Sequence, residues 1–202
     1  MKLYYSTGAC SLSPHIVLRE AGIPFELVAV DLRSKRLQDG SDFRTINPKG
    51  YVPALQLDDG QLLTEGPAIV QYIADLKPES KLAPPAGTFE RYRLQEWLTF
   101  IGTELHKSFG VFFHPNATDE ARNEARERLS TRFDFVAKAL EGKSYLLGDT
   151  FTAADAYLYT ILRWTKFAGI DLAKWPSIQA YFERVTARPA VQQALEAEKL
   201  KK

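Results

Sequence analysis

The residue best suited to chemistry is a lone cysteine, Cys10, which stands between a short apolar run and a helical pattern. Leu3-Tyr4-Tyr5 predicts a buried strand, and the stretch from Ser11 to Gly22 predicts the helix that follows. A helix start offers free N–H groups and a positive dipole end, so we expect the thiolate of Cys10 to be favoured. The second cysteine of a C-x-x-C motif is missing, so any disulfide needs an outside thiol. An inert buried cysteine is the alternative.

Two further motifs place polar groups at strand and helix ends. Pro53 has no N–H and suits the start of a strand, where the backbone of Val52 can pair with a short extended peptide. Glu65 precedes the helix that Gly66-Pro67 opens, so the helix start can bind a carboxylate while Glu65 holds an ammonium. The helix start and Glu65 together fit the carboxylate and the ammonium of an α-amino acid head group. An ordinary loop proline and simple helix capping are the alternatives. Further polar candidates are Ser11, Lys35 and Lys49.

A polar stripe runs along one predicted long helix. Thr99, Thr103, His106 and Lys107 follow helical spacing and share one face, which predicts that this face borders a cleft. His106 can donate a hydrogen bond to a bound thiol or carboxylate there. A structural histidine with satisfied hydrogen bonds is an equally good interpretation of the pattern.

The elements that position these residues divide the chain in two. The first part predicts strands at 3–5 and 25–30, an irregular stretch at 35–46, a hairpin over 54–64 and a helix from 66. Prolines and a glycine then mark a linker. Everything after it predicts helices: 88–113, 118–140, one capped by Thr152 with Asp155, and two that follow Trp175-Pro176 and Arg188-Pro189. We expect domains at 1–80 and 88–202, joined by a linker at 81–87.

Composition excludes several classes of function. The 202 residues carry a formal net charge of +1, so no strong field attracts nucleic acid or an anionic membrane. No apolar run reaches the length of a membrane span, and the N-terminus lacks the apolar core of a signal peptide. A single cysteine suits a reducing compartment. We expect a cytoplasmic protein with no nucleic-acid or membrane partner.

Taken in order, the motifs resemble those of the cytosolic glutathione transferases, most closely the bacterial beta class. The resemblance covers essentially the whole chain, and its most specific stretches are Gly8–Ser13, Asn47–Leu55, Leu63–Ile69, Glu104–Lys107 and Phe151–Leu158. Two positions depart from the pattern. Gly66 stands where most transferases have serine, and Thr99 stands where close relatives often have asparagine. The tyrosine that activates the thiol in other classes is lacking, and neither Tyr4 nor Tyr5 is assigned that role.

The resemblance implies a thioredoxin-like α/β N-terminal domain (βαβ-ββα) with Pro53 cis, packed on an all-α C-terminal domain. It implies a homodimer that binds glutathione as co-substrate near its interface, with Thr99 and Thr103 supplied by the partner subunit. No metal is implied. The glutathione-binding residues would be Cys10, Lys35, Tyr51, Val52, Pro53, Glu65, Gly66, Thr99, Thr103, His106 and Lys107. Cys10, Ser11 and His106 would be catalytic. We expect Phe109, Phe113 and Trp164 to line the site of the hydrophobic substrate, and packing of each ring in the core is the alternative.

The resemblance therefore predicts that the protein is a glutathione S-transferase that acts in detoxification. Its thiol co-substrate attacks a small electrophile, often halogenated or aromatic. The first alternative is a glutathione-dependent thiol–disulfide oxidoreductase or peroxidase that works through a Cys10 mixed disulfide. The second is a regulatory protein without enzyme activity on the same fold.

Overall fold

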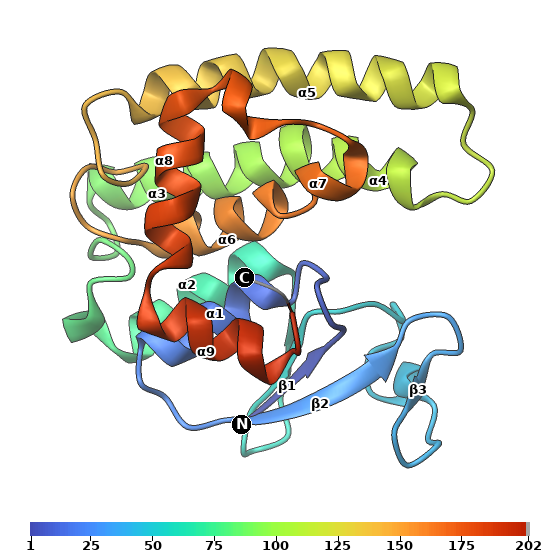
Figure 1. Cartoon of the computed structure of the whole chain (residues 1–202). Coiled ribbons are helices and arrows are strands. Elements are labelled where there is room, and N and C mark those ends of the chain that lie inside the picture. The colour runs from blue at the N-terminus through green and yellow to red at the C-terminus, as the bar shows by residue number, and fades with distance from the viewer. Residues whose placement is uncertain (201–202) are drawn as a thin grey trace. The chain divides into compact units, whose positions relative to one another are not determined.

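The computed structural model describes residues 1–200 (Figure 1). It divides into two compact units, and each is described by itself. One unit holds Met1–Ala83 together with residues 188–200, and the other holds Pro84–Ala187. Among residues 1–200, none of the helices is both long and apolar enough to cross a membrane.

The first unit is built on a five-stranded mixed sheet of order β3-β2-β1-β4-β5. Its strands are β1 (Lys2–Tyr5), β2 (Glu26–Asp31), β3 (Arg36–Leu37), β4 (Ala54–Gln56) and β5 (Leu62–Thr64). Strands β1 and β2 are parallel and the other pairs are antiparallel. This confirms the predicted thioredoxin-like order. The short strand β3 lies in the stretch that the sequence predicts to be irregular, because two residues are too few to show an alternating pattern.

Three helices of this unit, α1 (Leu12–Glu20), α2 (Gly66–Leu76) and α9 (Pro189–Ala197), gather on one face of the sheet (Figure 1). Helix α1 packs against both α2 and α9. Two short 3₁₀ turns, η1 (Phe43–Thr45) and η2 (Pro78–Ser80), complete the unit. Phe43 packs with Tyr4, Val30 and Val52 in a buried cluster that holds the segment before β4.

The second unit is entirely helical over its described residues, as predicted. Its elements are α3 (Phe89–Phe100), the π-helical turn η3 (Ile101–His106), α4 (Lys107–Phe113), α5 (Asp119–Leu140), α6 (Ala153–Leu162), α7 (Thr165–Ala168), the 3₁₀ turn η4 (Leu172–Lys174) and α8 (Pro176–Thr186). The side chains of Thr88 and Thr118 accept hydrogen bonds from backbone N–H groups at the starts of α3 and α5. At α6 the predicted capping box is present, formed by Thr152 and Asp155.

The structure differs from the predicted boundary at the C-terminal end. The sequence assigns the helix after Arg188-Pro189 to the helical domain, but α9 belongs to the compact unit that contains the sheet. Side-chain contacts explain the difference. Arg188 pairs with Glu20 at the end of α1 at 2.6 Å, and Glu198 bonds to His15 within α1 at 2.8 Å. Partners so far apart in the chain leave no local pattern in the sequence.

Candidate functional site

Cys10 lies between β1 and α1, where the sequence places it. Its Sγ donates a hydrogen bond to the carbonyl oxygen of Val52 at 3.4 Å, and the Val52–Pro53 peptide bond is cis. The thiol and the strand-edge backbone predicted to receive a peptide therefore lie side by side. Ala54, the next residue, opens β4, which pairs with β1.

The protonation state of Cys10 is opposite to the one expected from its position. Burial raises the pKa of the thiol to about 11, and the negative charge of Glu65 raises it further. Backbone N–H groups of Cys10 and Ser11 act in the other direction with a smaller effect. The prediction that the helix start favours the thiolate is therefore wrong for this state, because desolvation outweighs the helix terminus. At neutral pH the residue is a thiol and a hydrogen-bond donor.

Ser11 serves the backbone. Its Oγ accepts a hydrogen bond from the N–H of Ser6 at 3.2 Å and lies 3.3 Å from the carbonyl oxygen of the same residue, to which it can donate. The side chain is fully buried. Ser11 thus closes the loop between β1 and α1. Its side chain supports the loop that carries Cys10.

Glu65 stands at the start of α2, as predicted, and Gly66 is the first residue of that helix. Its Oε1 accepts a hydrogen bond from Lys49 Nζ at 2.6 Å and one from the Tyr51 hydroxyl at 3.4 Å. Lys49 also donates to the hydroxyl of Thr64 at 3.0 Å. Glu65 has a positive φ of 71°, a conformation that L-residues rarely adopt. The carboxylate is therefore held at the helix start by a lysine that an ammonium ligand would join or displace.

Lys35 lies in the same unit, beside the turn that leads to Tyr51 and Val52. Its Cδ would lie 3.7 Å from a β-carbon at Gly50, which has a φ of +66°. The carbonyl of Lys35 accepts a hydrogen bond from Phe43 N at 2.8 Å. The structure thus brings the predicted N-terminal residues Cys10, Lys35, Tyr51, Val52, Pro53, Glu65 and Gly66 into one unit.

His106 ends the π-helical turn in the other unit. Its Nδ1 lies 2.6 Å from the hydroxyl oxygen of Tyr157, and its ring meets the ring of Trp164 edge-on at 5.0 Å. Burial lowers the pKa of His106 to about 4, and the charge of Lys107 acts in the same direction. The imidazole is therefore neutral at physiological pH. A π-turn inserts an extra residue into a helix and is frequent at functional sites.

The other polar residues of this stripe are exposed. Thr99, Thr103 and Lys107 face solvent, and the Thr103 hydroxyl donates back to the carbonyl of Thr99 at 3.0 Å. Thr99 and Thr103 are both exposed, and their contribution from a partner subunit stays a prediction.

The predicted apolar walls meet around Trp164. Its ring contacts Phe109 at 5.7 Å and Phe113 at 5.1 Å, and Phe113 stacks on Phe167 at 5.4 Å. Phe109 is fully buried, so it supports the cluster from the core. Phe113 and Phe167 are more than half exposed and present ring faces to solvent. Sequence reasoning missed Phe167, although its spacing of three from Trp164 places both on one side of a helical turn.

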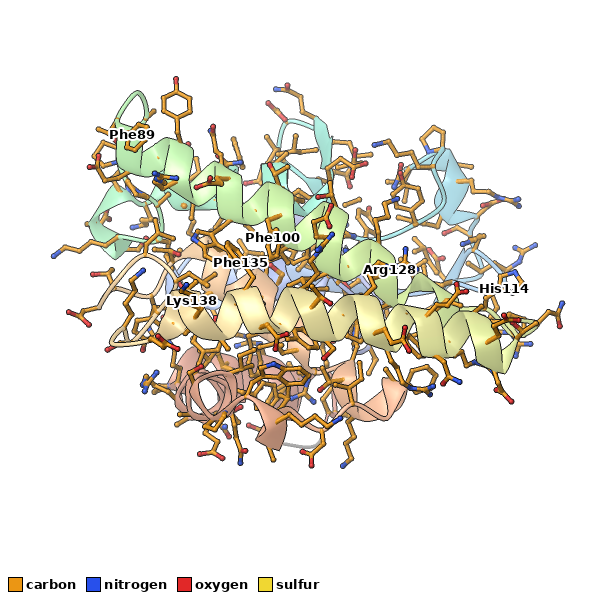
Figure 2. All side chains as sticks on the ribbon, turned by 90° about the horizontal axis from the view of Figure 1, so that it is seen from above. Phe89, Phe100, His114, Arg128, Phe135 and Lys138 are labelled. Atoms are coloured by element: carbon orange, nitrogen blue, oxygen red, sulfur yellow. The ribbon has the colours of Figure 1, made fainter. Side chains whose placement is uncertain are left out.

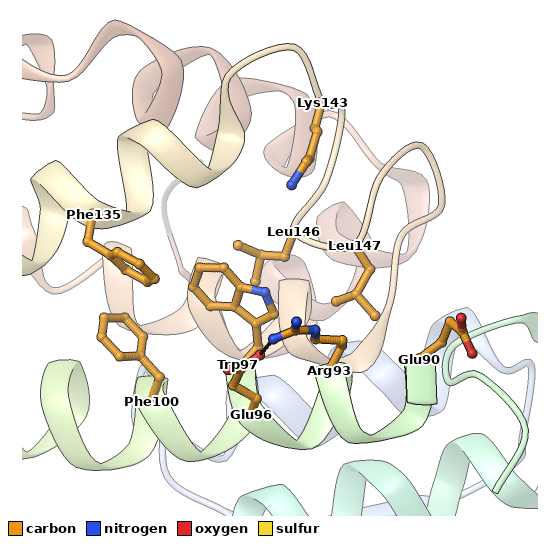
Figure 3. A pocket seen from close by; sticks show the side chains of 9 residues that line it. All are labelled: Glu90, Arg93, Glu96, Trp97, Phe100, Phe135, Lys143, Leu146 and Leu147. Atoms are coloured by element: carbon orange, nitrogen blue, oxygen red, sulfur yellow. Dashed lines mark hydrogen bonds and ion pairs between the residues drawn. The ribbon is translucent and has the colours of Figure 1, made fainter. Parts of the chain in front are cut away.

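A groove of about 640 Å³ lies elsewhere on the helical unit, and the sequence did not predict it. It runs along α3 and α5, where Phe100 and Phe135 lie side by side (Figures 2 and 3). The rings of Trp97, Phe100 and Phe135 form its apolar floor, with centroids 5.1 to 5.7 Å apart. Charged residues of both signs edge it, among them Arg93 paired with Glu96 at 2.7 Å. Among residues 1–200, no cluster of His, Cys, Asp or Glu could hold a metal ion.

Comparisons with known proteins identify the family of the chain. Residues 7–76 match the family described as glutathione S-transferase, N-terminal domain, and residues 100–189 match glutathione S-transferase, C-terminal domain. The chain is 49% identical to glutathione S-transferase GstA of Escherichia coli O157:H7, over the full length of both proteins.

Two solved structures have the same fold over nearly every residue. A ternary complex of BphK, a bacterial GST, shares 60% identity with a TM-score of 0.97, covering 99% of this chain and 100% of that one. A bacterial beta-class glutathione S-transferase from Sphingomonas chungbukensis shares 48% identity with a TM-score of 0.96, covering 100% of both chains.

Proposed function

The chain belongs to the bacterial beta class of the glutathione S-transferases, and on that premise we propose that it conjugates glutathione to small electrophiles, often halogenated or aromatic. One observation carries the assignment of the site. The protonated Cys10 thiol donates to the carbonyl of Val52, the residue whose backbone the sequence predicts to pair with an added peptide. A peptide thiol paired there comes within reach of the Cys10 S–H.

The remaining groups of the sheet-containing unit fit the rest of a γ-glutamyl tripeptide. The N-terminus of α2 at Gly66 can bind the γ-glutamyl carboxylate through backbone N–H groups, and Glu65 can hold the ammonium. Lys35 carries a charge that matches the glycyl carboxylate. The hydroxyl lost where Gly66 replaces serine leaves backbone N–H groups as the donors to that carboxylate.

The reaction proposed is a nucleophilic displacement. The glutathione thiol gives up its proton to solvent, the sulfur forms a bond to the electrophilic carbon, and the halide leaves with the electron pair of the broken bond. The protein's task is to stabilise the thiolate. Cys10 keeps its S–H at neutral pH because its own pKa lies near 11, and we propose that this S–H turns from the Val52 carbonyl to that sulfur when glutathione binds. We assign His106 as a second donor, as the family resemblance implies.

The high pKa of Cys10 favours conjugation over the redox alternative. A mixed disulfide forms through attack by a thiolate, and a thiol with a pKa near 11 is almost entirely protonated at neutral pH. The same protonated thiol can donate a hydrogen bond, which is the role that conjugation assigns to Cys10.

Turnover of glutathione with a chloronitrobenzene tests this function. We expect activity well above the uncatalysed rate, retained in large part by Cys10→Ser and reduced by Cys10→Ala, because serine keeps a donor and alanine does not. Equal loss in both variants, together with one added glutathione on the intact mass of the wild type, would instead support a covalent disulfide role. Absence of turnover and of binding to glutathione resin would leave the regulatory alternative.

We propose further that the chain is a homodimer that uses the groove on α3 and α5. Phe135 in the groove and Tyr92 on α3 are both more than half exposed, and exposed aromatic surface of this kind marks interaction sites. Charges of both signs around the groove suit a self-complementary contact. Thr99 and Thr103 are exposed on the same helix stretch. Sedimentation of wild type and Phe135→Asp tests this, with a dimer and a monomer expected.

A further inference from the structure

Tyr157 is a buried residue of α6 that the proposed chemistry does not use. Its side chain is 4% exposed, and its hydroxyl lies 2.6 Å from His106 Nδ1. Gly102, in the π-turn, faces the same hydroxyl: a β-carbon at that position would come within 3.6 Å of it. That distance is an ordinary van der Waals contact, so Gly102 lies against the Tyr157 hydroxyl.

The rings around His106 fix its plane. Tyr157 meets it edge-on at 5.9 Å and 82°, and Trp164 at 5.0 Å and 69°. An imidazole held by two aromatic rings and a short hydrogen bond has one orientation. In that orientation Nδ1 faces Tyr157, and Nε2 lies on the opposite side of the ring.

The direction of the hydrogen bond follows from acidity. A phenol is a far stronger acid than a neutral imidazole N–H, and an unprotonated imidazole nitrogen is a much better acceptor than a phenol oxygen. A separation of 2.6 Å is typical of a strong O–H donor. The hydrogen therefore belongs to the Tyr157 oxygen, and Nδ1 accepts it.

We propose that Tyr157 is a positioning residue for the transferase, which holds His106 as the neutral Nε2–H tautomer and so makes Nε2 a hydrogen-bond donor for a bound ligand. This inference rests on the proposed role of His106. A neutral histidine can carry its hydrogen on either nitrogen, and only the Nε2–H form can donate from that side. Among residues 1–200, the structure shows no partner at Nε2.

Imidazole nitrogen NMR of the full-length protein tests the tautomer without reference to activity. Long-range ¹H–¹⁵N correlation distinguishes a nitrogen that carries hydrogen from one that does not. The chain has three histidines, and His15 serves as an internal standard. Arg19 Nε donates to His15 Nε2 at 2.8 Å, so His15 is expected with its hydrogen on Nδ1. We expect the opposite pattern for His106, and hydrogen on its Nδ1 would overturn the proposal.

The Tyr157→Phe variant tests the consequence. We expect its His106 signals to shift toward a mixture of tautomers and kcat to fall about tenfold, with KM for glutathione changed less than about twofold. The matched control is Tyr159→Phe. Tyr159 lies on the same helix and is fully buried, and its hydroxyl bonds to Arg163 and Thr186. It should leave the His106 spectrum and kcat unchanged even where it costs stability.

The outcomes separate the two proposals. Unchanged His106 signals or unchanged kcat in Tyr157→Phe would reject the positioning role. If that variant fails to fold, the wild-type spectrum alone still decides the tautomer. Full activity in His106→Ala would reject the proposed role of His106 in transfer, even with the tautomer confirmed, and the positioning role would fall with it.

Discussion

His15 and His106 are both flanked by aromatic rings, and each has a hydrogen bond at Nδ1. The two histidines differ at Nε2. His15 is fully buried and both its nitrogens are occupied, Nδ1 by Glu198 and Nε2 by Arg19, each at 2.8 Å. His106 uses only Nδ1, with Tyr157 as partner. The first histidine has no nitrogen left for a ligand and the second has one. The number of occupied nitrogens therefore separates a structural histidine from a candidate catalytic one.

The network around His15 also reaches the thiol loop. Glu198 bonds with one carboxylate oxygen to His15 and accepts a hydrogen bond on the other from the N–H of Gly8 at 3.0 Å. Gly8 lies two residues before Cys10 and has a φ of +71°, which favours glycine. Glu198 thus fixes the backbone that leads to Cys10.

Removing Glu198 should break the hydrogen-bond network of the structural histidine, His15. We expect this change to have the largest effect of those predicted. In Glu198→Ala, the His15 Nδ1–H and the Gly8 N–H both lose a buried acceptor. We expect the free energy of unfolding to fall by about 3 kcal/mol, measured by urea denaturation. Glu196→Ala is the control, because Glu196 is exposed near the end of the same helix. Equal stability in the two variants would show that the network contributes little.

A second prediction concerns the protonation state that Cys10 shares with His106, since both groups are neutral at physiological pH. Because burial raises the pKa of Cys10 to about 11, its alkylation by iodoacetamide should accelerate about tenfold per pH unit from pH 7 to 10. Intact mass reports the reaction directly, because Cys10 is the single cysteine. N-acetylcysteine is the reference and should level off above its own, lower pKa. A Cys10 rate that is already flat at pH 8 would contradict the raised pKa of the thiol.

The sequence predicts those features that depend on neighbours along the chain. The strand and helix around Cys10, the start of α2 at Gly66, and the Thr152–Asp155 capping box all follow from local patterns, and the structure has each of them. The resemblance to the transferases added the cis bond before Pro53, which the structure also has.

Features that depend on distant neighbours could not be predicted in this way. The position of Cys10 at a helix start favours a thiolate, but the burial that reverses this arises from the folded environment. His15 and Glu198 are 183 residues apart, so their contact leaves no spacing to recognise. Ser11 has the right residue type for catalysis, and only the structure shows that its hydroxyl bonds to Ser6.

The smallest predicted effect tests the aromatic cluster around Trp164, whose ring meets that of His106. Phe167 stacks on Phe113 and is 65% exposed, so it extends the Trp164 cluster outward. If aromatic electrophiles bind there, Phe167→Ala should lower kcat/KM for a chloronitrobenzene about threefold to tenfold, because one stacked ring contributes about 0.5–1.5 kcal/mol. A small aliphatic halide should be unaffected.

Phe89→Ala is the matched control for this experiment, because Phe89 is 66% exposed and contacts the Arg93 side chain outside the Trp164 cluster. Because Phe89 and Phe167 are similarly exposed, the two variants lose a similar apolar surface area. A difference in kcat/KM between them therefore depends on where the ring lies. Equal kcat/KM in the two variants with the aromatic substrate would place the electrophile away from Phe167. A selective loss in Phe167→Ala would extend the substrate site from Trp164 to the α7 helix.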